Sequence, residues 1–133
     1  EEQGFMKGQD VFAFTLTHVP KDIKKVLAFA GTTIDNADFI VLHQANAFMN
    51  SFLTKKMKLD TDKVMNTIHK FGNTSSVSVP LTIVSELKDK LDGDKTILAS
   101  AFGVGMTWAS AVLPFCNCRI SDIVEVENGE PVK

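Results

Sequence analysis

Apolar residues recur along the chain at two spacings, one typical of helices and the other of strands. The helical spacing predicts three helices, at residues 20–30, at residues 45–53 and from Pro80 onward. Proline opens the first and third of these helices, and Gly31 and Gly93 end them. Apolar or alternating runs predict strands at residues 38–42, 95–101 and 107–115. Because helices and strands interleave over the whole length, the sequence indicates the layered α/β class.

Several details of this pattern give further expectations. The third helix directs four leucine or valine side chains inward, namely Leu81, Val84, Leu87 and Leu91. The last two strands flank the glycine turn "FGVGM" and are expected to pair antiparallel. Residues 11–17 fit both a strand and a helix, since their apolar positions satisfy either period. In the mixed C-terminal tail, Ile123, Val124 and Val126 suggest an added edge strand.

The composition of the chain limits the classes of partner that it is expected to bind. The chain has 133 residues, which predicts one domain, residues 1–133, and its formal charge of −2 comes without a basic block. We therefore expect no nucleic-acid partner. The apolar stretches are too short to cross a membrane, so no membrane partner is expected either. Residue 1 is Glu rather than Met and no signal peptide is evident, which favours a processed or excised piece of a cytoplasmic protein.

The two cysteines, Cys116 and Cys118, are separated by one residue. Two thiolates at that spacing do not complete a four-ligand zinc site unless a distant histidine joins them. We therefore predict no metal site, and we expect both to be free thiols that are buried or half-buried.

Three polar or glycine-rich stretches each follow an apolar segment. His43 and Asn46 come where the strand 38–42 ends and the next helix begins, "GNTSS" occupies residues 72–76, and "FGVG" occupies residues 102–105. Each has an ordinary explanation: a strand-end histidine with Asn46 as helix N-cap, a tight turn, and a hairpin. Each also fits chemistry, because an imidazole, an amide and glycine backbone N–H groups can all stabilise an oxyanion. At one edge of an α/β sheet the three stretches can meet in a single site.

The residues of these motifs and their order along the chain resemble those of one enzyme family. "HQAN" at 43–46, "GNTSSVSVP" at 72–80 and "FGVGMTWAS" at 102–110, with "MKGQDVF" upstream at 6–12, look like the C-terminal half of a β-ketoacyl-acyl-carrier-protein synthase III. The resemblance implies the C-terminal half of a thiolase-like α/β/α fold with a mixed sheet and antiparallel C-terminal strands. It also favours a helix at residues 11–17.

The resemblance also implies roles for residues. This family joins an acyl group to malonyl-acyl-carrier protein by decarboxylative Claisen condensation with a Cys, a His and an Asn. His43 and Asn73 match the family's His and Asn, which stabilise the malonyl enolate, and the backbone of Gly103 and Val104 matches an oxyanion hole. The residues implied to line the pantetheine channel and the route to the site are Gln44, Ala45, Asn46, Met6, Gly8, Phe12 and Phe102.

The family's nucleophilic Cys lies in an N-terminal half that precedes this segment, and the role does not transfer to Cys116 or Cys118. We therefore expect the 133-residue chain alone to be inactive and to self-associate through its uncovered apolar face. The implied partners are that missing half, acyl-CoA and acyl carrier protein, with no cofactor, and the family suggests a dimer. Ala47-Phe48 replaces the family's frequent Leu-Arg, so Lys55, Lys56 and Lys58 are the candidate carrier-protein contacts, although helix-end lysines are also favoured by the dipole alone.

Three alternatives stay open at this point. A related acyltransferase could use His43 as general base to form an ester or an amide. A Cys-His-Asn hydrolase could combine Cys116 or Cys118 with His43 and Asn73, provided that a thiol lies within hydrogen-bond reach of the imidazole. The third alternative is a non-catalytic module that binds carrier protein or coenzyme A.

Overall fold

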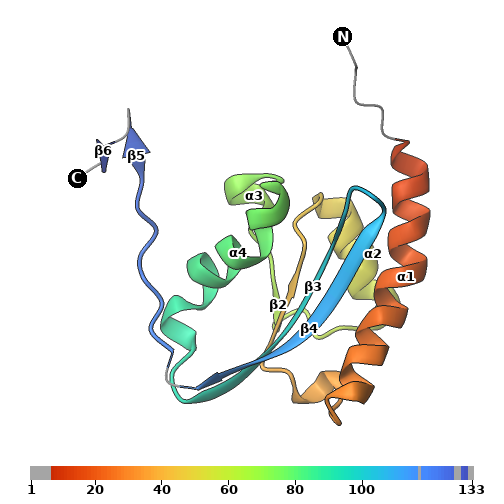
Figure 1. The fold of residues 1–133 in the computed structure, drawn as a ribbon, viewed down its shortest axis with the longest axis horizontal. Helices are drawn as coiled ribbons and strands as arrows, with labels where there is room; N and C mark the ends of the chain where they lie inside the picture. The colour runs from red at the N-terminus through yellow and green to blue at the C-terminus, as the bar shows by residue number, and fades with distance from the viewer. Residues whose placement is uncertain (1–6, 117, 128–129, 132–133) are drawn as a thin grey trace.

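The central element of the molecule is a four-stranded sheet with the strand order β2-β1-β3-β4 (Figure 1). The computed structural model describes residues 7–116, 118–127 and 130–131. The strands are β1 (Phe39–Leu42), β2 (Val64–Met65), β3 (Asp94–Gly103) and β4 (Thr107–Cys116). β1 runs parallel to β2 and β3, whereas β3 and β4 are antiparallel. The predicted mixed sheet with antiparallel C-terminal strands is confirmed.

Helices cover both faces of this sheet. α1 (Gly8–Phe29) and α2 (Ala47–Met57) pack on one face, and α4 (Ser78–Leu87) packs on the other (Figure 1). Side chains alternate along β1, so that Ile40 and Leu42 enter the first core while Val41 enters the second. The chain therefore has three layers, α/β/α, as predicted.

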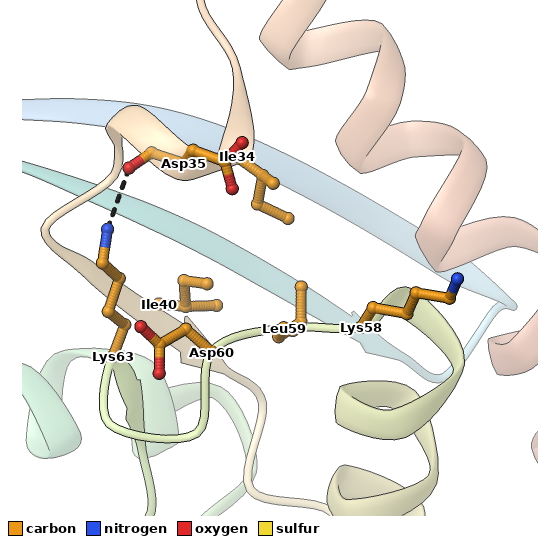
Figure 2. Close-up of a pocket in the computed structure, with 7 residues that line it drawn as sticks. All are labelled: Ile34, Asp35, Ile40, Lys58, Leu59, Asp60 and Lys63. Carbon is orange, nitrogen blue, oxygen red and sulfur yellow. Dashed lines mark hydrogen bonds between the residues drawn. The ribbon is translucent and has the colours of Figure 1, made fainter.

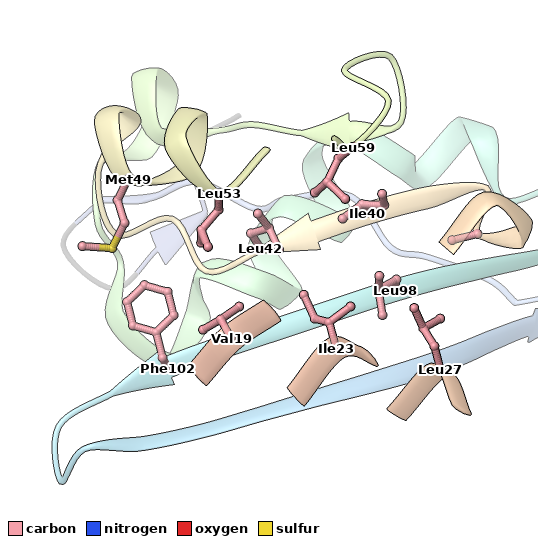
Figure 3. Close-up of a cluster of buried hydrophobic side chains, with 11 residues drawn as sticks. Val19, Ile23, Leu27, Ile40, Leu42, Met49, Leu53, Leu59, Leu98 and Phe102 are labelled. Atoms are coloured by element: carbon pink, nitrogen blue, oxygen red, sulfur yellow. The ribbon is translucent and has the colours of Figure 1, made fainter. Parts of the chain in front are cut away.

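The first core lies between α1, α2 and the sheet (Figure 3). Val19, Ile23 and Leu27 of α1 recur every four residues and face Leu98 and Phe102 of β3. Ile23 is 0% exposed, and burying a side chain of this size contributes about 1.5–3 kcal/mol. This packing anchors the long helix α1 to the strand that leads to the candidate site.

α1 is one continuous helix that passes through Pro20. The helix predicted at residues 11–17 is confirmed, but the prediction that Pro20 opens a separate helix is wrong. Proline has no backbone N–H, so the carbonyl of Leu16 loses its usual partner four residues later. Lys56 Nζ of α2 donates a hydrogen bond of 2.8 Å to that carbonyl oxygen. A lysine from another helix thus satisfies the acceptor that proline leaves open.

α4 begins two residues earlier than predicted, at Ser78, after the short helix α3 (Ile68–Phe71). Leu87 and, beyond the helix end, Leu91 are buried as expected. The rest of the predicted inward face is rotated, because the buried positions of the first turns are Ser78 and Thr82. These polar side chains face inward because each finds a hydrogen-bond partner there, Ser78 with His43 after β1 and Thr82 with Thr67 before α3.

The C-terminal tail does not add a strand to the main sheet. β5 (Val126–Glu127) pairs only with β6 (Glu130–Pro131), in a separate two-stranded sheet, so the expected edge strand is wrong. Cys116 and Cys118 are both exposed, which corrects the expectation of buried or half-buried thiols. Cys116 ends the edge strand β4 opposite Asp94, whose carboxylate accepts a hydrogen bond from the thiol and raises its pKa.

Within the described residues, the helices are all too short or too polar to cross a membrane.

Candidate functional site

His43 stands directly after β1, at the carboxyl edge of the sheet. Its backbone N–H donates to Ser100 O at 2.8 Å, so the parallel pairing with β3 continues one residue past the strand. Its ring meets the ring of Phe102 nearly at right angles, with centroids 5.2 Å apart. The residue is only 9% exposed. The packing therefore leaves the imidazole little freedom to turn.

The electrostatics of His43 favour a neutral ring. Burial lowers the pKa of His43 below its ordinary value, because desolvation disfavours the charged imidazolium. Nδ1 lies 2.6 Å from Ser78 Oγ at the start of α4. Within residues 7–116 and 118–127, the structure shows no hydrogen bond to Nε2. One ring nitrogen is thus anchored, and the other remains for a ligand.

Gln44 is a structural residue of this edge. It is 1% exposed, its Nε2 donates to Leu42 O at 2.7 Å, and its Oε1 accepts from the N–H groups of Thr67 and Ile68. The amide nitrogen is therefore bonded to β1, and the amide oxygen is bonded to the backbone at the start of α3. This corrects the expectation that Gln44 lines a channel, since its side chain faces the interior and closes the strand end.

The loop "GNTSS" presents Asn73 at the surface. Asn73 Oδ1 accepts a hydrogen bond of 3.0 Å from Ser75 N, which fixes the side-chain carbonyl and leaves the amide N–H₂ group as a donor. Gly72 and Ser75 both have positive φ, 67° and 54°. The structure connects this loop to His43 through Ser78, which lies five residues after Asn73. A direct approach of Asn73 to His43 stays a prediction, because the hydrogen bonds of the described residues do not join the two.

The β3–β4 turn lies at the same edge as His43, since Phe102 touches the imidazole and the turn follows at once. Val104 is 96% exposed, and its carbonyl accepts a hydrogen bond from Thr107 Oγ1. Gly105 needs to be glycine, because its φ is 131° and a Cβ there would lie 2.9 Å from Thr107 Cγ2. Gly103 has no such requirement. The oxyanion role of the Gly103 and Val104 backbone stays a prediction.

The start of α2 borders the same region. Asn46 caps the helix, and its Oδ1 accepts from Met49 N at 2.8 Å, while Ala45 packs against the first core. Phe12 of α1 stacks on Phe48 of α2, with ring centroids 5.6 Å apart. These two rings and Phe52 form one aromatic patch, in which Phe48 is 68% exposed. Gly8 is exposed at the first residue of α1, and Met6 lies outside the described residues.

The three candidate docking lysines differ in their surroundings. Lys55 is exposed in the last turn of α2, and Lys58 is its left-handed C-cap, with φ 54°. Lys56 Nζ donates a hydrogen bond to Leu16 O, so its ammonium group already has an intramolecular partner. Lys55 and Lys58 therefore fit an external partner better than Lys56 does.

Two hollows of the surface lie away from this edge. Figure 2 shows the smaller, of about 60 Å³, where Lys63 donates to the carbonyl oxygen of Asp35. The larger, of about 490 Å³, lies between α1 and the end of α2. Neither is lined by His43 or Asn73. In the part of the chain that the structure describes, no three His, Cys, Asp or Glu side chains are grouped to hold a metal ion.

The hydrolase alternative is wrong for Cys116. This residue pairs with Asp94 at one end of β3, whereas His43 contacts Phe102 near the other end. At about 3.3 Å per residue, these strand positions are about 26 Å apart, far beyond hydrogen-bond reach.

Comparison with known proteins identifies the family. Residues 27–115 match the family model described as 3-Oxoacyl-[acyl-carrier-protein (ACP)] synthase III C terminal. The chain belongs to this family. The β-ketoacyl-[acyl-carrier-protein] synthase III of Geobacillus kaustophilus is 35% identical over 114 residues, which cover 85% of this chain and 37% of the relative. For the synthase III 1 of Halalkalibacterium halodurans, the identity is 38% over 110 residues, covering 81% of this chain and 35% of the relative.

Solved structures give the same result. A 3-oxoacyl-(acyl-carrier protein) synthase from Burkholderia xenovorans superposes with a TM-score of 0.84 at 43% identity, covering 89% of this chain and 34% of that one. A synthase III from Thermus thermophilus superposes with a TM-score of 0.77 at 31% identity. The match covers 82% of this chain and 34% of that one. This synthase III C-terminal domain therefore has the fold of its relatives and spans about a third of their length.

Sequence reasoning missed one residue of the site in this synthase III domain. Ser78 lies within the quoted motif "GNTSSVSVP" but was given no role there, and its hydroxyl is the closest polar neighbour of His43 among the bonds described. The available signal was its position two residues before Pro80, since proline prefers the first turn of a helix. In the structure, Ser78 is the first residue of that helix, and its hydroxyl meets His43 at the strand end.

Proposed function

We propose that this domain forms part of a condensing enzyme that joins an acyl thioester to malonyl-acyl-carrier protein with loss of CO₂. The relatives described above are named β-ketoacyl-[acyl-carrier-protein] synthases III, and three motifs of that family occur here in order. The observation that carries the proposal is the environment of His43. A neutral imidazole is held by its Nδ1 side at the edge of an α/β sheet, where ligand sites commonly form.

The proposed role of His43 and Asn73 is to stabilise the malonyl enolate. As CO₂ leaves, negative charge develops on the thioester oxygen, and two donors aimed at that oxygen lower the barrier. The Asn73 amide suits this role because its carbonyl is engaged by Ser75 N, which leaves the N–H₂ group outward. The imidazole suits it because burial keeps it uncharged, and a low-dielectric surrounding strengthens its hydrogen bonds.

The acyl group is proposed to be carried by a nucleophile outside residues 1–133. Cys116 lies at the opposite end of the sheet from His43, and Cys118 follows it in the exposed tail. We propose that a Cys in the rest of the full-length enzyme receives the acyl group from acyl-CoA. The backbone of Gly103 and Val104 then stabilises the oxyanion of the acyl thioester. The 133-residue chain alone is accordingly proposed to be inactive.

Acyl carrier protein is the proposed donor of the malonyl group. Its acidic surface would meet Lys55 and Lys58 at the end of α2, and its pantetheine arm would pass Asn46 and Phe12. Phe48, which stands where the family resemblance places an arginine, gives this entrance an aromatic rim instead of a positive charge. We therefore expect docking to depend less on salt than docking through an arginine.

The experiment uses the full-length enzyme with acyl-CoA and malonyl-acyl-carrier protein. We expect CO₂ release coupled to acyl transfer, and we expect His43→Ala to lower that rate about 10²- to 10³-fold, the usual loss for one oxyanion donor. His69→Ala is the matched control, because His69 is exposed on α3 and should leave the rate unchanged. An ester or amide product without CO₂ would instead identify the related acyltransferase. An unchanged rate in His43→Ala would contradict both.

A further inference from the structure

We infer that Ser78 is a positioning residue that holds the His43 imidazole in the tautomer with its proton on Nε2. This is the tautomer that can donate a hydrogen bond to a substrate oxygen. The inference rests on the proposed function for the identity of that oxygen, whereas the tautomer itself follows from the hydrogen bonds of the protein.

The hydrogen bonds of the Ser78 hydroxyl group determine the tautomer of His43. Ser78 Oγ lies 2.6 Å from His43 Nδ1 and 3.3 Å from Gln44 N. A backbone N–H can only donate, so Oγ accepts from Gln44 and must place its own proton elsewhere. Among the described residues, His43 Nδ1 is the one acceptor bonded to this hydroxyl group. Ser78 therefore donates to Nδ1, which must carry a lone pair, and the ring proton resides on Nε2.

The opposite arrangement is unfavourable. If Nδ1 carried the proton and donated to Ser78 Oγ, the hydroxyl proton would be left without an acceptor. Ser78 is 1% exposed, so water could not replace the lost partner. A buried unsatisfied donor costs free energy comparable to a lost hydrogen bond.

A closed set of buried polar groups keeps Ser78 in place. Thr82 Oγ1 donates to Ser78 O at 2.8 Å and lies 2.6 Å from Thr67 Oγ1. Thr67 N donates to Gln44 Oε1 at 2.9 Å, and Gln44 N returns to Ser78 Oγ. All four side chains are at most 2% exposed. One of these links lies within α4, and the others join α4, the segment before α3 and the residues that follow β1, so these three parts of the chain together set the position of the Ser78 hydroxyl.

This arrangement matters for the proposed chemistry. With the proton on Nε2, the imidazole offers a donor to the enolate oxygen. With the other tautomer it would offer a lone pair, which repels the same oxygen. Fixing the tautomer in advance removes a reorganisation step from the reaction, which is the usual source of oxyanion stabilisation.

The direct test measures the tautomer in the full-length wild-type enzyme. Histidine would be labelled with ¹⁵N, and long-range ¹H–¹⁵N spectra at pH 8 would report the protonation of each ring nitrogen. His43→Gln identifies the resonances that belong to His43. We expect an unprotonated Nδ1 and a protonated Nε2. A protonated Nδ1 would overturn the inference, and this measurement needs no Ser78 variant to fold.

The second test separates positioning from simple structural support. In Ser78→Ala we expect kcat to fall about 10- to 100-fold with little change in KM for the malonyl substrate. The reason is that His43 Nδ1 loses the hydroxyl group that orients the imidazole. The same variant should show a mixture of tautomers. Ser78→Thr keeps a hydroxyl group and should restore most of the activity. An unchanged kcat, or an unchanged tautomer with a lowered kcat, would contradict the inference.

Ser85→Ala is the matched control for these variants. Ser85 lies on the same helix and donates to Glu86 Oε1 at 2.7 Å, away from His43, so kcat should stay at the wild-type value. The two proposals remain distinguishable. An enzyme that does not condense malonyl thioesters would refute the proposed function, while the tautomer of His43 would still be read from the spectra.

Discussion

At the residue scale, Gly72 sets the direction of the Asn73 carboxamide. Its φ of 67° and ψ of −158° lie in a region that essentially only glycine occupies. A Cβ at this position would meet nothing within 4 Å, so the cost of substitution comes from the backbone alone. We expect Gly72→Ala to lower the free energy of unfolding by about 1–3 kcal/mol, or to flip the peptide and turn Asn73 away.

Urea denaturation and CO₂ release by the full-length enzyme would test Gly72→Ala together. Gly31→Ala is the control, because Gly31 also has a positive φ, of 64°, and open space around its Cβ, but it follows the C-terminal end of α1. That variant should lose stability without losing CO₂ release. A Gly72→Ala enzyme with full stability and full activity would show that the turn does not depend on this glycine.

Residue-scale prediction succeeded where the signal is local. The strand-end position of His43 and the capping role of Asn46 follow from residues next to them in sequence, and both are found. The roles of Gln44 and Ser78 depend on partners 23 and 34 residues away, which no local pattern reveals. Gln44 therefore looked like a channel residue, although its buried amide is fully engaged by the backbone.

At the element scale, the pairing of Pro20 with Lys56 explains how α1 stays continuous. Leu16 O has no N–H from residue 20 and accepts from Lys56 Nζ instead. We expect Lys56→Met to lower the free energy of unfolding by about 0.5–1.5 kcal/mol, the usual net value of one hydrogen bond. In a Pro20→Ala background, where the backbone N–H returns, the same substitution should cost clearly less.

A double-mutant cycle of these two residues would measure the coupling directly. The readout is urea denaturation at a protein concentration low enough to keep the chain monomeric. Lys55→Met is the control, because Lys55 is exposed in the same helical turn and the described contacts give its side chain no role like that of Lys56. Equal costs of Lys56→Met in the two backgrounds would mean that the lysine does not compensate for the proline.

Element boundaries were harder to predict than the elements themselves. All three predicted helical segments and all three main strands are found, although the first predicted helix is the second half of the longer helix α1. Proline did not mark the helix starts correctly. Pro20 lies inside α1, and Pro80 lies two residues after the start of α4. The first buried turn of α4 is polar because it faces His43 and Thr67, and a hydrophobic pattern cannot reveal a polar interface.

At the scale of the whole molecule, the interleaving of helices and strands predicted the layered α/β class, and the family resemblance implied the three layers. Residues of β1 alternate between two cores, so both faces of the sheet had to be covered by helices. The tail could not be predicted in the same way. Its apolar residues, Ile123, Val124 and Val126, remain exposed and are 44%, 62% and 59% accessible, so their spacing reflects no core of this chain.

The aromatic patch of Phe12, Phe48 and Phe52 gives a prediction about association. The patch is contiguous, and large exposed apolar patches commonly mark contacts with other surfaces. The chain spans only about a third of its relatives, so a surface that faces the remaining two thirds in them would be uncovered here. We therefore expect the 133-residue chain alone to self-associate as its concentration rises.

Sedimentation velocity over a wide concentration range would test this, with Phe48→Arg as the informative variant. An arginine in the centre of the patch should weaken association, because burying its charge against a second copy is unfavourable. Phe29→Arg is the control, since Phe29 is 92% exposed and stacks on no described aromatic side chain, so little association energy should depend on it. A monomer at the highest concentration would refute self-association. Equal effects of the two variants on association would mean that the contact between copies lies outside the aromatic patch.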